Sequence, residues 1–78
     1  MQKDINGWIS VTDALPEFEE DVLLWYLFKE KQYITIGYLE RVETTKDGSK
    51  PSFWLPENDR LYQEIHFWQK LPKGPINI

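Results

Sequence analysis

The sequence predicts a small, mainly β protein. Apolar residues alternate with polar ones on either side of a short polar link, and the apolar segments are rich in aromatic and β-branched residues. Turn-forming residues separate these segments at short intervals. We expect an antiparallel sheet of four or five strands, curled into a sandwich or half-open barrel. The alternative is an α+β fold with one or two short helical turns.

The length of the chain allows one domain. Its 78 residues form a single unit, 1–78, with the core expected in 8–75. The first strand is predicted in segment 8–11, Trp-Ile-Ser-Val, whose residues favour extended structure. One helical turn over 13–15 would then end at Pro16, because the residue before a proline avoids helical geometry. An acidic loop follows.

The strongest strand signal is segment 21–28, which is apolar on both faces. Such a strand is typical of the centre of a sheet and is expected to be covered on both sides. After the polar link 29–32, alternation resumes over 33–40, so the two segments predict a β-hairpin. Gly37 within the second segment indicates a bulge, or a place where a large ring packs on bare backbone.

The second half of the chain alternates loops and short apolar segments. Residues 41–51 contain the turn signal Asp-Gly and are expected to form a mobile loop or the tip of an extended hairpin. Segment 52–55 is short and apolar, and the loop 57–60 after it has room for one helical turn. A last strand is predicted over 64–71. Tryptophans near both ends, Trp8 and Trp68, are expected on neighbouring segments of one core.

Charge and composition exclude several classes of protein. The net charge is −4, and the lysines are scattered among acidic residues, which argues against a nucleic-acid binder. The chain has no cysteine, so it has neither a disulfide nor a thiolate metal site, which fits a reducing compartment. No apolar run is long enough for a membrane helix, and the start does not resemble a signal peptide. We therefore expect a cytoplasmic protein with no membrane contact.

The motifs at the two ends resemble a known family. Trp-Ile-Ser-Val, Asp-x-Leu-Pro, Asp-Val-Leu, a Gly-Tyr pair and Trp-x-x-Leu-Pro together are similar to the phage and prophage family called domain of unknown function number 551. The matching positions are Trp8–Val11, Asp13, Leu15, Pro16, Asp21–Leu23, Gly37, Tyr38, Trp68, Leu71 and Pro72. The resemblance implies a fold and a phage or mobile-element context, but no reaction.

The chain departs from the family pattern at one position. In the family, a histidine tends to stand directly before the closing tryptophan, whereas here Phe67 precedes Trp68 and the histidine is His66. A shift by one residue in a strand moves a side chain to the opposite face of the sheet. A role for the family's histidine is therefore not carried over to this chain.

No residue pattern indicates catalysis or a cofactor. His66 is the only histidine, and no serine stands in a nucleophile motif. One histidine does not make a zinc site, the spacing of a calcium loop is missing, and the glycines do not form a phosphate-binding loop. We predict no enzyme activity, no catalytic residue, no metal and no cofactor.

The aromatic residues are the candidate binding residues. The chain has four Trp, four Tyr and four Phe. These rings either fill the hydrophobic core of a domain that has no disulfides, or some of them are exposed and bind a partner. Phe53 and Trp54 are the first candidates for exposure, because they lie between two polar loops. Trp25 and Tyr33 are expected to share the second face of the hairpin.

These observations predict an accessory binding module. Its partner is expected to be another protein, or a second copy of the chain paired through an exposed edge strand. The alternative is a protein that binds or sequesters a small, nucleotide-like molecule. A protein-binding module would present a flat aromatic patch, whereas a ligand binder would have a concave pocket lined by rings, with Arg41, Arg60 or a lysine nearby.

Overall fold

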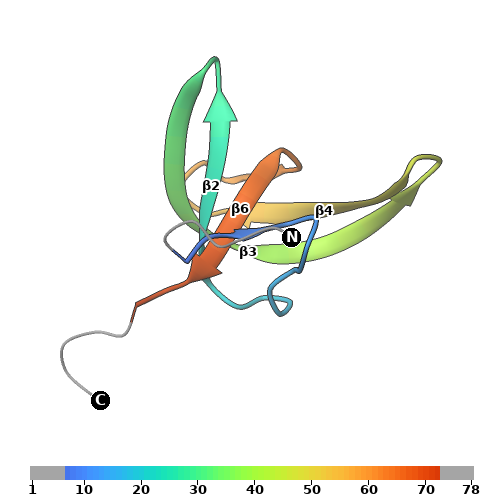
Figure 1. Ribbon diagram of the computed structural model, residues 1–78, viewed down its shortest axis with the longest axis horizontal. Coiled ribbons are helices and arrows are strands. Elements are labelled where there is room, and N and C mark those ends of the chain that lie inside the picture. The colour runs from blue at the N-terminus through green and yellow to red at the C-terminus, as the bar shows by residue number, and fades with distance from the viewer. Residues whose placement is uncertain (1–6, 73–78) are drawn as a thin grey trace.

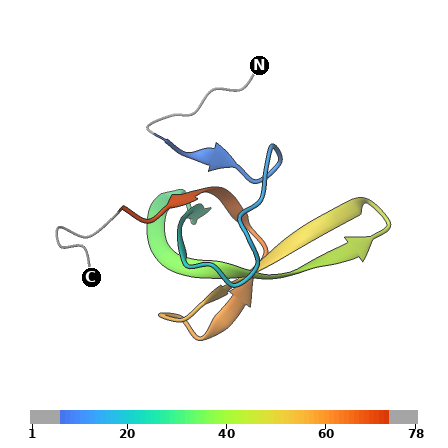
Figure 2. The same ribbon diagram turned by 90° about the horizontal axis from the view of Figure 1, so that it is seen from below.

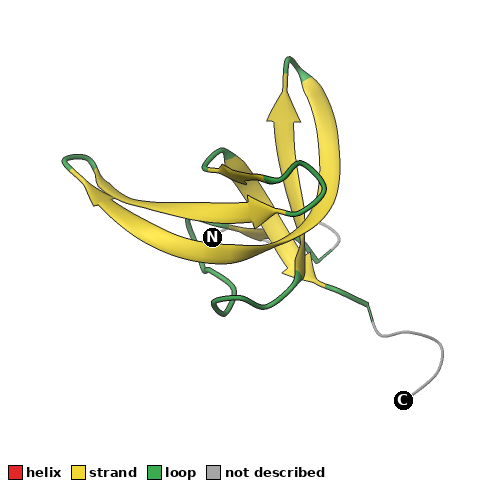
Figure 3. Cartoon of the chain, turned by 180° about the vertical axis from the view of Figure 1, so that it is seen from behind, coloured by secondary structure: helices red, strands yellow, loops and turns green. Residues whose placement is uncertain are grey.

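The computed structural model describes residues 7–72 and consists of strands, turns and loops, with no helix in that range (Figure 3). Six strands form one antiparallel sheet in the order β1-β6-β2-β3-β4-β5, and its two end strands, β1 and β5, do not pair. The strands are β1 (Ile9–Ser10), β2 (Val22–Phe28), β3 (Lys31–Thr45), β4 (Gly48–Leu55), β5 (Arg60–Tyr62) and β6 (Ile65–Lys70). The mainly β prediction is confirmed, with six strands instead of four or five and without the helical turns.

Strand β2 is central in the sheet, between β6 and β3, as the sequence predicts. One face of it is buried, with Val22, Leu24 and Tyr26 in the core. On the other face Leu23 and Trp25 are half-buried and Leu27 is 43% exposed. The expectation of cover on both faces is therefore wrong, because the described part of the chain supplies no second layer over that side.

The turn between β2 and β3 is shorter than the polar link suggests. Lys29 and Glu30 form it alone, both with left-handed backbone conformation (φ 51° and 67°), and β3 begins at Lys31. Two successive residues with positive φ are typical of the turn that matches the right-handed twist of a β-hairpin. This two-residue turn places Phe28 opposite Lys31 and Tyr26 opposite Tyr33.

Strand β3 is long and belongs to two hairpins that point in different directions (Figure 1). Residues 31–37 pair with β2, and residues 38–45 pair with β4, with a register shift between Leu39 and Arg41. Segment 41–51 is thus the outer part of an extended hairpin, the second of the two alternatives for it. The change of direction folds the sheet around one core.

That core lies on the concave side of the folded sheet. Its buried apolar residues are Val22, Leu24, Tyr26, Leu39, Phe53, Leu55, Ile65 and Trp68. Gly37 is buried next to the point where β3 begins to pair with β4. A Cβ there would clash with the Trp54 carbonyl oxygen and lie 2.8 Å from Leu24 Cδ1. Gly37 therefore allows a close approach of backbone, but the approaching group is a carbonyl and not the ring that the sequence suggested. The predicted bulge is also absent at Gly37, because the register shifts of the sheet lie at other positions.

The two ends of the described chain meet at this core (Figure 2). Strand β1 pairs with β6, with Ile9 opposite Trp68. Trp68 is only 5% exposed, and its Nε1 donates a hydrogen bond to the Ala14 carbonyl oxygen at 2.9 Å. Trp8 is half-buried and adjoins β1. Trp8 and Trp68 thus stand on neighbouring segments, as predicted, but only Trp68 belongs to the core. Nothing in the range 7–72 forms a helix of the kind that spans a membrane.

Candidate functional site

One face of the β6-β2-β3 part of the sheet is apolar and open to solvent. We call it the outer face, and it comprises Leu23, Trp25, Leu27, Ile34, Ile36 and Phe67. Cross-strand pairing brings these residues together, with Trp25 opposite both Ile34 and Phe67. Ile34 is 59% exposed and Ile36 is 48% exposed. None of the six residues carries a charge, so the face offers apolar contact alone.

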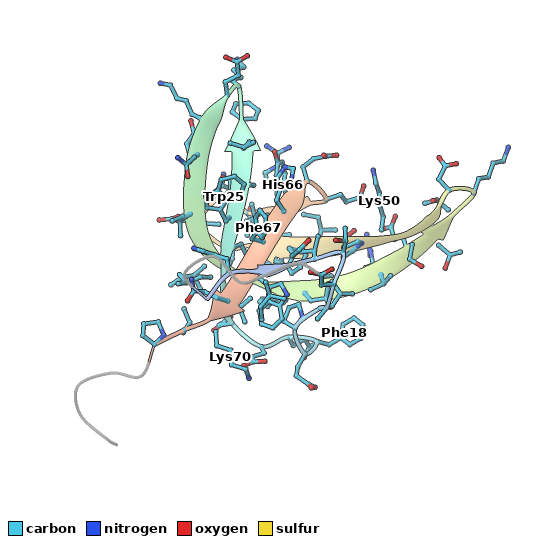
Figure 4. All side chains as sticks on the ribbon, in the orientation of Figure 1. Phe18, Trp25, Lys50, His66, Phe67 and Lys70 are labelled. Atoms are coloured by element: carbon cyan, nitrogen blue, oxygen red, sulfur yellow. The ribbon has the colours of Figure 1, made fainter. Side chains whose placement is uncertain are left out.

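Trp25 occupies the middle of the outer face and is held in place by its neighbours. Its ring meets Phe67 edge-on at 5.4 Å between centroids, and His66 in the same way at 5.8 Å (Figure 4). Its Nε1 donates a hydrogen bond to Gln32 Oε1 at 3.0 Å. The indole is therefore fixed in one orientation while part of its surface stays accessible.

His66 reaches Trp25 because the ladder is irregular there. Trp25 pairs with Phe67 and Tyr26 pairs with Ile65, which leaves His66 unpaired in a bulge between them. The side chain is exposed, and its ring contact is with the indole. His66 thus borders the outer face, and the described contact of its ring is with an aromatic residue and not with a nucleophile.

A second candidate site lies on the opposite face of the same hairpin. We call it the tyrosine pocket: a cavity of about 270 Å³ lined by Tyr26, Phe28, Tyr33, Leu55, Asn58, Arg60 and Tyr62. Tyr26 stacks on Tyr33 with centroids 5.4 Å apart, and Tyr62 packs against Tyr26 at 4.9 Å. The Arg60 guanidinium lies 5.7 Å from the Tyr62 ring centroid. The pocket thus combines flat ring surfaces with one cation.

The Tyr26 hydroxyl stays protonated in this pocket. Burial raises the pKa of Tyr26, because the phenolate loses its hydration, and the neighbouring phenols of Tyr62 and Tyr33 raise it further. The Glu57 carboxylate acts in the same direction, while Arg60 opposes it. The hydroxyl is consequently a neutral group that can donate a hydrogen bond to a ligand.

Comparison with known proteins places the chain in a family. The model of the family described as "Protein of unknown function (DUF551)" matches residues 7–76. The chain belongs to the DUF551 family. The family predicted from the sequence is thereby confirmed. No curated protein and no solved structure matches the chain.

The DUF551 fold corrects two of the sequence predictions for binding residues. Phe53 is completely buried, so the expectation that it is exposed is wrong. It lies between Leu39 and Tyr62 in the ladder, and its ring fills the core. Trp54 points to the other side and is half-buried between Tyr38 and Leu61. Neither residue belongs to the outer face or lines the tyrosine pocket.

The predicted pairing of Trp25 with Tyr33 on one face is also wrong. The two-residue turn pairs even-numbered positions of β2 with odd-numbered positions of β3, so Tyr33 joins Tyr26 and Trp25 joins Ile34. Trp25 therefore belongs to the outer face and Tyr33 to the tyrosine pocket. Sequence reasoning missed Leu27, Ile34 and Ile36 as surface residues, although the alternation of β3 already grouped the two isoleucines.

The described residues do not include a cluster of metal-ligating side chains. Within residues 7–72, no three His, Cys, Asp or Glu side chains gather in a group that could hold an ion. The same range has no buried polar side-chain atom that lacks a hydrogen-bond partner. The arrangement can therefore bind through apolar and aromatic contact, and through the polar rim of the tyrosine pocket.

Proposed function

We propose that this DUF551 domain is a cytoplasmic accessory module of a phage or mobile element that binds a protein partner through its outer face. The exposed apolar surface of Leu27, Ile34 and Ile36 carries the proposal. Contiguous apolar patches of this kind mark interaction sites on soluble proteins. Burying the accessible half of each side chain would contribute about 1 kcal/mol. The phage setting is supported by the family resemblance alone.

Trp25 suits the role of the central anchor. Tryptophan is enriched among the residues that dominate binding energy, especially near the centre of an interface. The hydrogen bond to Gln32 and the edge contact with Phe67 already fix the indole in the free protein. Binding then costs little side-chain entropy, which increases the affinity that the ring contributes.

The lack of charge on the outer face gives the interaction a recognisable signature. Salt weakens association that depends on exposed charges, but leaves apolar contact largely unaffected or strengthens it. A partner bound at this face should therefore remain bound when the ionic strength is raised from about 0.1 M to about 1 M. Loss of the partner in salt would point to a different, charged surface.

The proposal is tested by comparing variants of the outer face with a variant of an aromatic residue that lies elsewhere on the surface. The protein is used as bait in an extract of the cells that express it, with Trp25→Ala as the test and Phe18→Ala as the control. Phe18 is 60% exposed and lies away from Trp25 (Figure 4). We expect Phe18→Ala to retain the partner, and both Trp25→Ala and Ile36→Lys to lose it about tenfold or more. Equal capture by all three variants would refute the proposal.

A small planar ligand bound in the tyrosine pocket is the second candidate. The concave shape, the stacked rings and the Arg60 guanidinium favour a flat molecule with an anionic group, such as a nucleotide. At about 270 Å³ the cavity is slightly below the range of roughly 300–1,000 Å³ that ligand pockets usually occupy, so it ranks behind the outer face.

Native mass spectrometry separates this candidate from the first one. Protein purified gently from expressing cells should carry an excess mass of roughly a few hundred daltons per chain if a ligand occupies the pocket. Arg60→Ala should lose that mass, whereas Arg41→Ala, which removes an arginine that does not line the pocket, should keep it. A clean polypeptide mass in wild-type protein would contradict the ligand.

A further inference from the structure

The first half of β3 is paired on one side only. Its residues 31–37 pair with β2, and pairing with β4 begins at Tyr38, opposite Trp54. Strand β4 ends at Leu55, after which Pro56 begins a turn. In the described chain, the part of β3 from Lys31 to Ile36 therefore presents an open edge.

The turn fixes which backbone groups point to that edge. A turn of the Lys29-Glu30 type closes with a hydrogen bond between the residues that flank it, here Phe28 and Lys31. Hydrogen-bonded and non-hydrogen-bonded pairs then alternate along an antiparallel ladder. The N–H and C=O groups that point away from β2 are therefore those of Gln32, Ile34 and Ile36.

Apart from Lys31 at its start, this edge carries nothing that protects it against pairing. Natural edge strands usually carry charges, a proline or a bulge that keeps other strands away. Segment 32–36, Gln-Tyr-Ile-Thr-Ile, has none of these, and the register shifts of the sheet lie elsewhere. Its β-branched and aromatic residues favour strand pairing, and Tyr33 and Ile34 are 40% and 59% exposed.

The surface beside the edge has room for a further strand. A groove of about 410 Å³ is lined by Leu23, Ile34, Thr35, Ile36, Pro56 and Glu57. Thr35 Oγ1 donates a hydrogen bond to Glu57 Oε1 at 3.1 Å, which holds the turn after β4 against the end of this groove. A strand added here must therefore run from Ile36 toward the tip of the hairpin.

We propose that a second copy of the chain pairs with this edge, antiparallel, with Tyr33 opposite Tyr33 at the two-fold axis. This register places Gln32 opposite Ile34, and Lys31 opposite Thr35. A pairing centred nearer to Gly37 would run into the turn at Pro56, whereas one centred nearer to Lys29 would leave the isoleucines uncovered.

Charge complementarity supports a second copy as the occupant. In the proposed register, Lys31 of one copy stands opposite Thr35 of the other, whose hydroxyl is bonded to Glu57. The ammonium group thus comes close to a carboxylate, and no like charges face each other across the edge. Among the described residues, neither Lys31 nor Glu57 forms an ion pair within its own chain.

The pairing would also enlarge the outer face. Residues directly opposite each other in a ladder point to the same side of the sheet, so the outer faces of the two copies become continuous. The inference does not rest on the proposed function, because it depends on the backbone edge and not on what binds the outer face.

Cysteine cross-linking tests the register, because the natural chain has no cysteine. Opposite residues in a non-hydrogen-bonded pair have Cα atoms about 4.5 Å apart, within the range that a disulfide spans. Tyr33→Cys should therefore form a disulfide-linked dimer under mild oxidation. The control is Ile36→Cys, which is similarly exposed, but whose two copies would lie about 20 Å apart along the strands.

We expect Tyr33→Cys to cross-link at least about ten times faster than Ile36→Cys. Equal rates would overturn the proposed register. Sedimentation equilibrium of the unmodified protein provides a second measurement that no substitution can disturb, and it should show a reversible dimer. A monomer over the whole concentration range would overturn the pairing. That result would leave the proposed function untouched, because binding of a partner at the outer face is tested separately by the Trp25→Ala and Phe18→Ala variants.

Discussion

Gly37→Ala adds one methyl group at the tightest backbone contact of the fold. The new Cβ would overlap the Trp54 carbonyl oxygen and would lie 2.8 Å from Leu24 Cδ1 and 3.2 Å from Leu55 Cδ2. Leu24 can change rotamer, but the carbonyl belongs to β4 and moves only if the strand moves. Because β4 carries Phe53 and Leu55 into the core, a shift of that strand disturbs the packing on both sides.

The size of the effect follows from two opposing contributions. Overpacking a core by one methyl group typically costs about 1–3 kcal/mol. Replacing glycine by alanine in a strand recovers about 0.5–1 kcal/mol, because the unfolded chain loses conformational freedom. Since the obstacle is backbone, we take the upper part of the first range and expect a net destabilisation of about 2 kcal/mol.

Urea unfolding followed by tryptophan fluorescence measures this change. The control is Gly48→Ala at the tip of the β3–β4 hairpin, where a Cβ has nothing within 4 Å and the cost comes from its positive φ (121°) alone. We expect that cost to be about 1 kcal/mol, with the midpoint for Gly37→Ala clearly lower. A Gly37→Ala protein within about 0.5 kcal/mol of wild type would show that β3 and β4 do not approach as closely as described.

Three further predictions concern the stability of the fold. Trp68→Ala should lower the free energy of unfolding in urea by about 3–5 kcal/mol, because it leaves a cavity in the core and removes the hydrogen bond to the Ala14 carbonyl oxygen. A loss below about 1 kcal/mol would place the ring at the surface. Replacing Lys29-Glu30 by Asn-Gly should raise the free energy of unfolding by about 1 kcal/mol, since both positions have positive φ; an unchanged midpoint would contradict the turn. The raised pKa of Tyr26 means that its contribution to stability is complete below the unfolded-state pKa, about 10, and is lost as pH rises through the folded-state value. Tyr26→Phe should flatten this alkaline decline in thermal unfolding curves, and an unchanged decline would exclude Tyr26 as its source.

Most of the strands could be placed along the chain because alternation and turn residues are local signals, but β5 lies where a loop with a helical turn was expected. The apolar segment that became β2 and the contact between the Trp8 and Trp68 ends both follow from residue type. The faces of the hairpin could not be derived in the same way. They depend on the length of the turn, and Lys29-Glu30 carries no glycine or asparagine to indicate two residues with positive φ. The burial of Phe53 depends on its register with Leu39 and Tyr62, which alternation within one short strand does not determine.

The same turn explains why the two candidate sites are separate. With two residues between β2 and β3, every side chain next to Trp25 on β3 points outward, and every side chain next to Tyr26 points inward. The apolar residues of one hairpin are thus divided between an outer face without charge and a concave pocket with an arginine. A partner bound by the first and a ligand bound by the second would contact different side chains, so substitutions can remove one without removing the other. The open edge of β3 lies between the two surfaces, which is why pairing of two copies there would extend both at once.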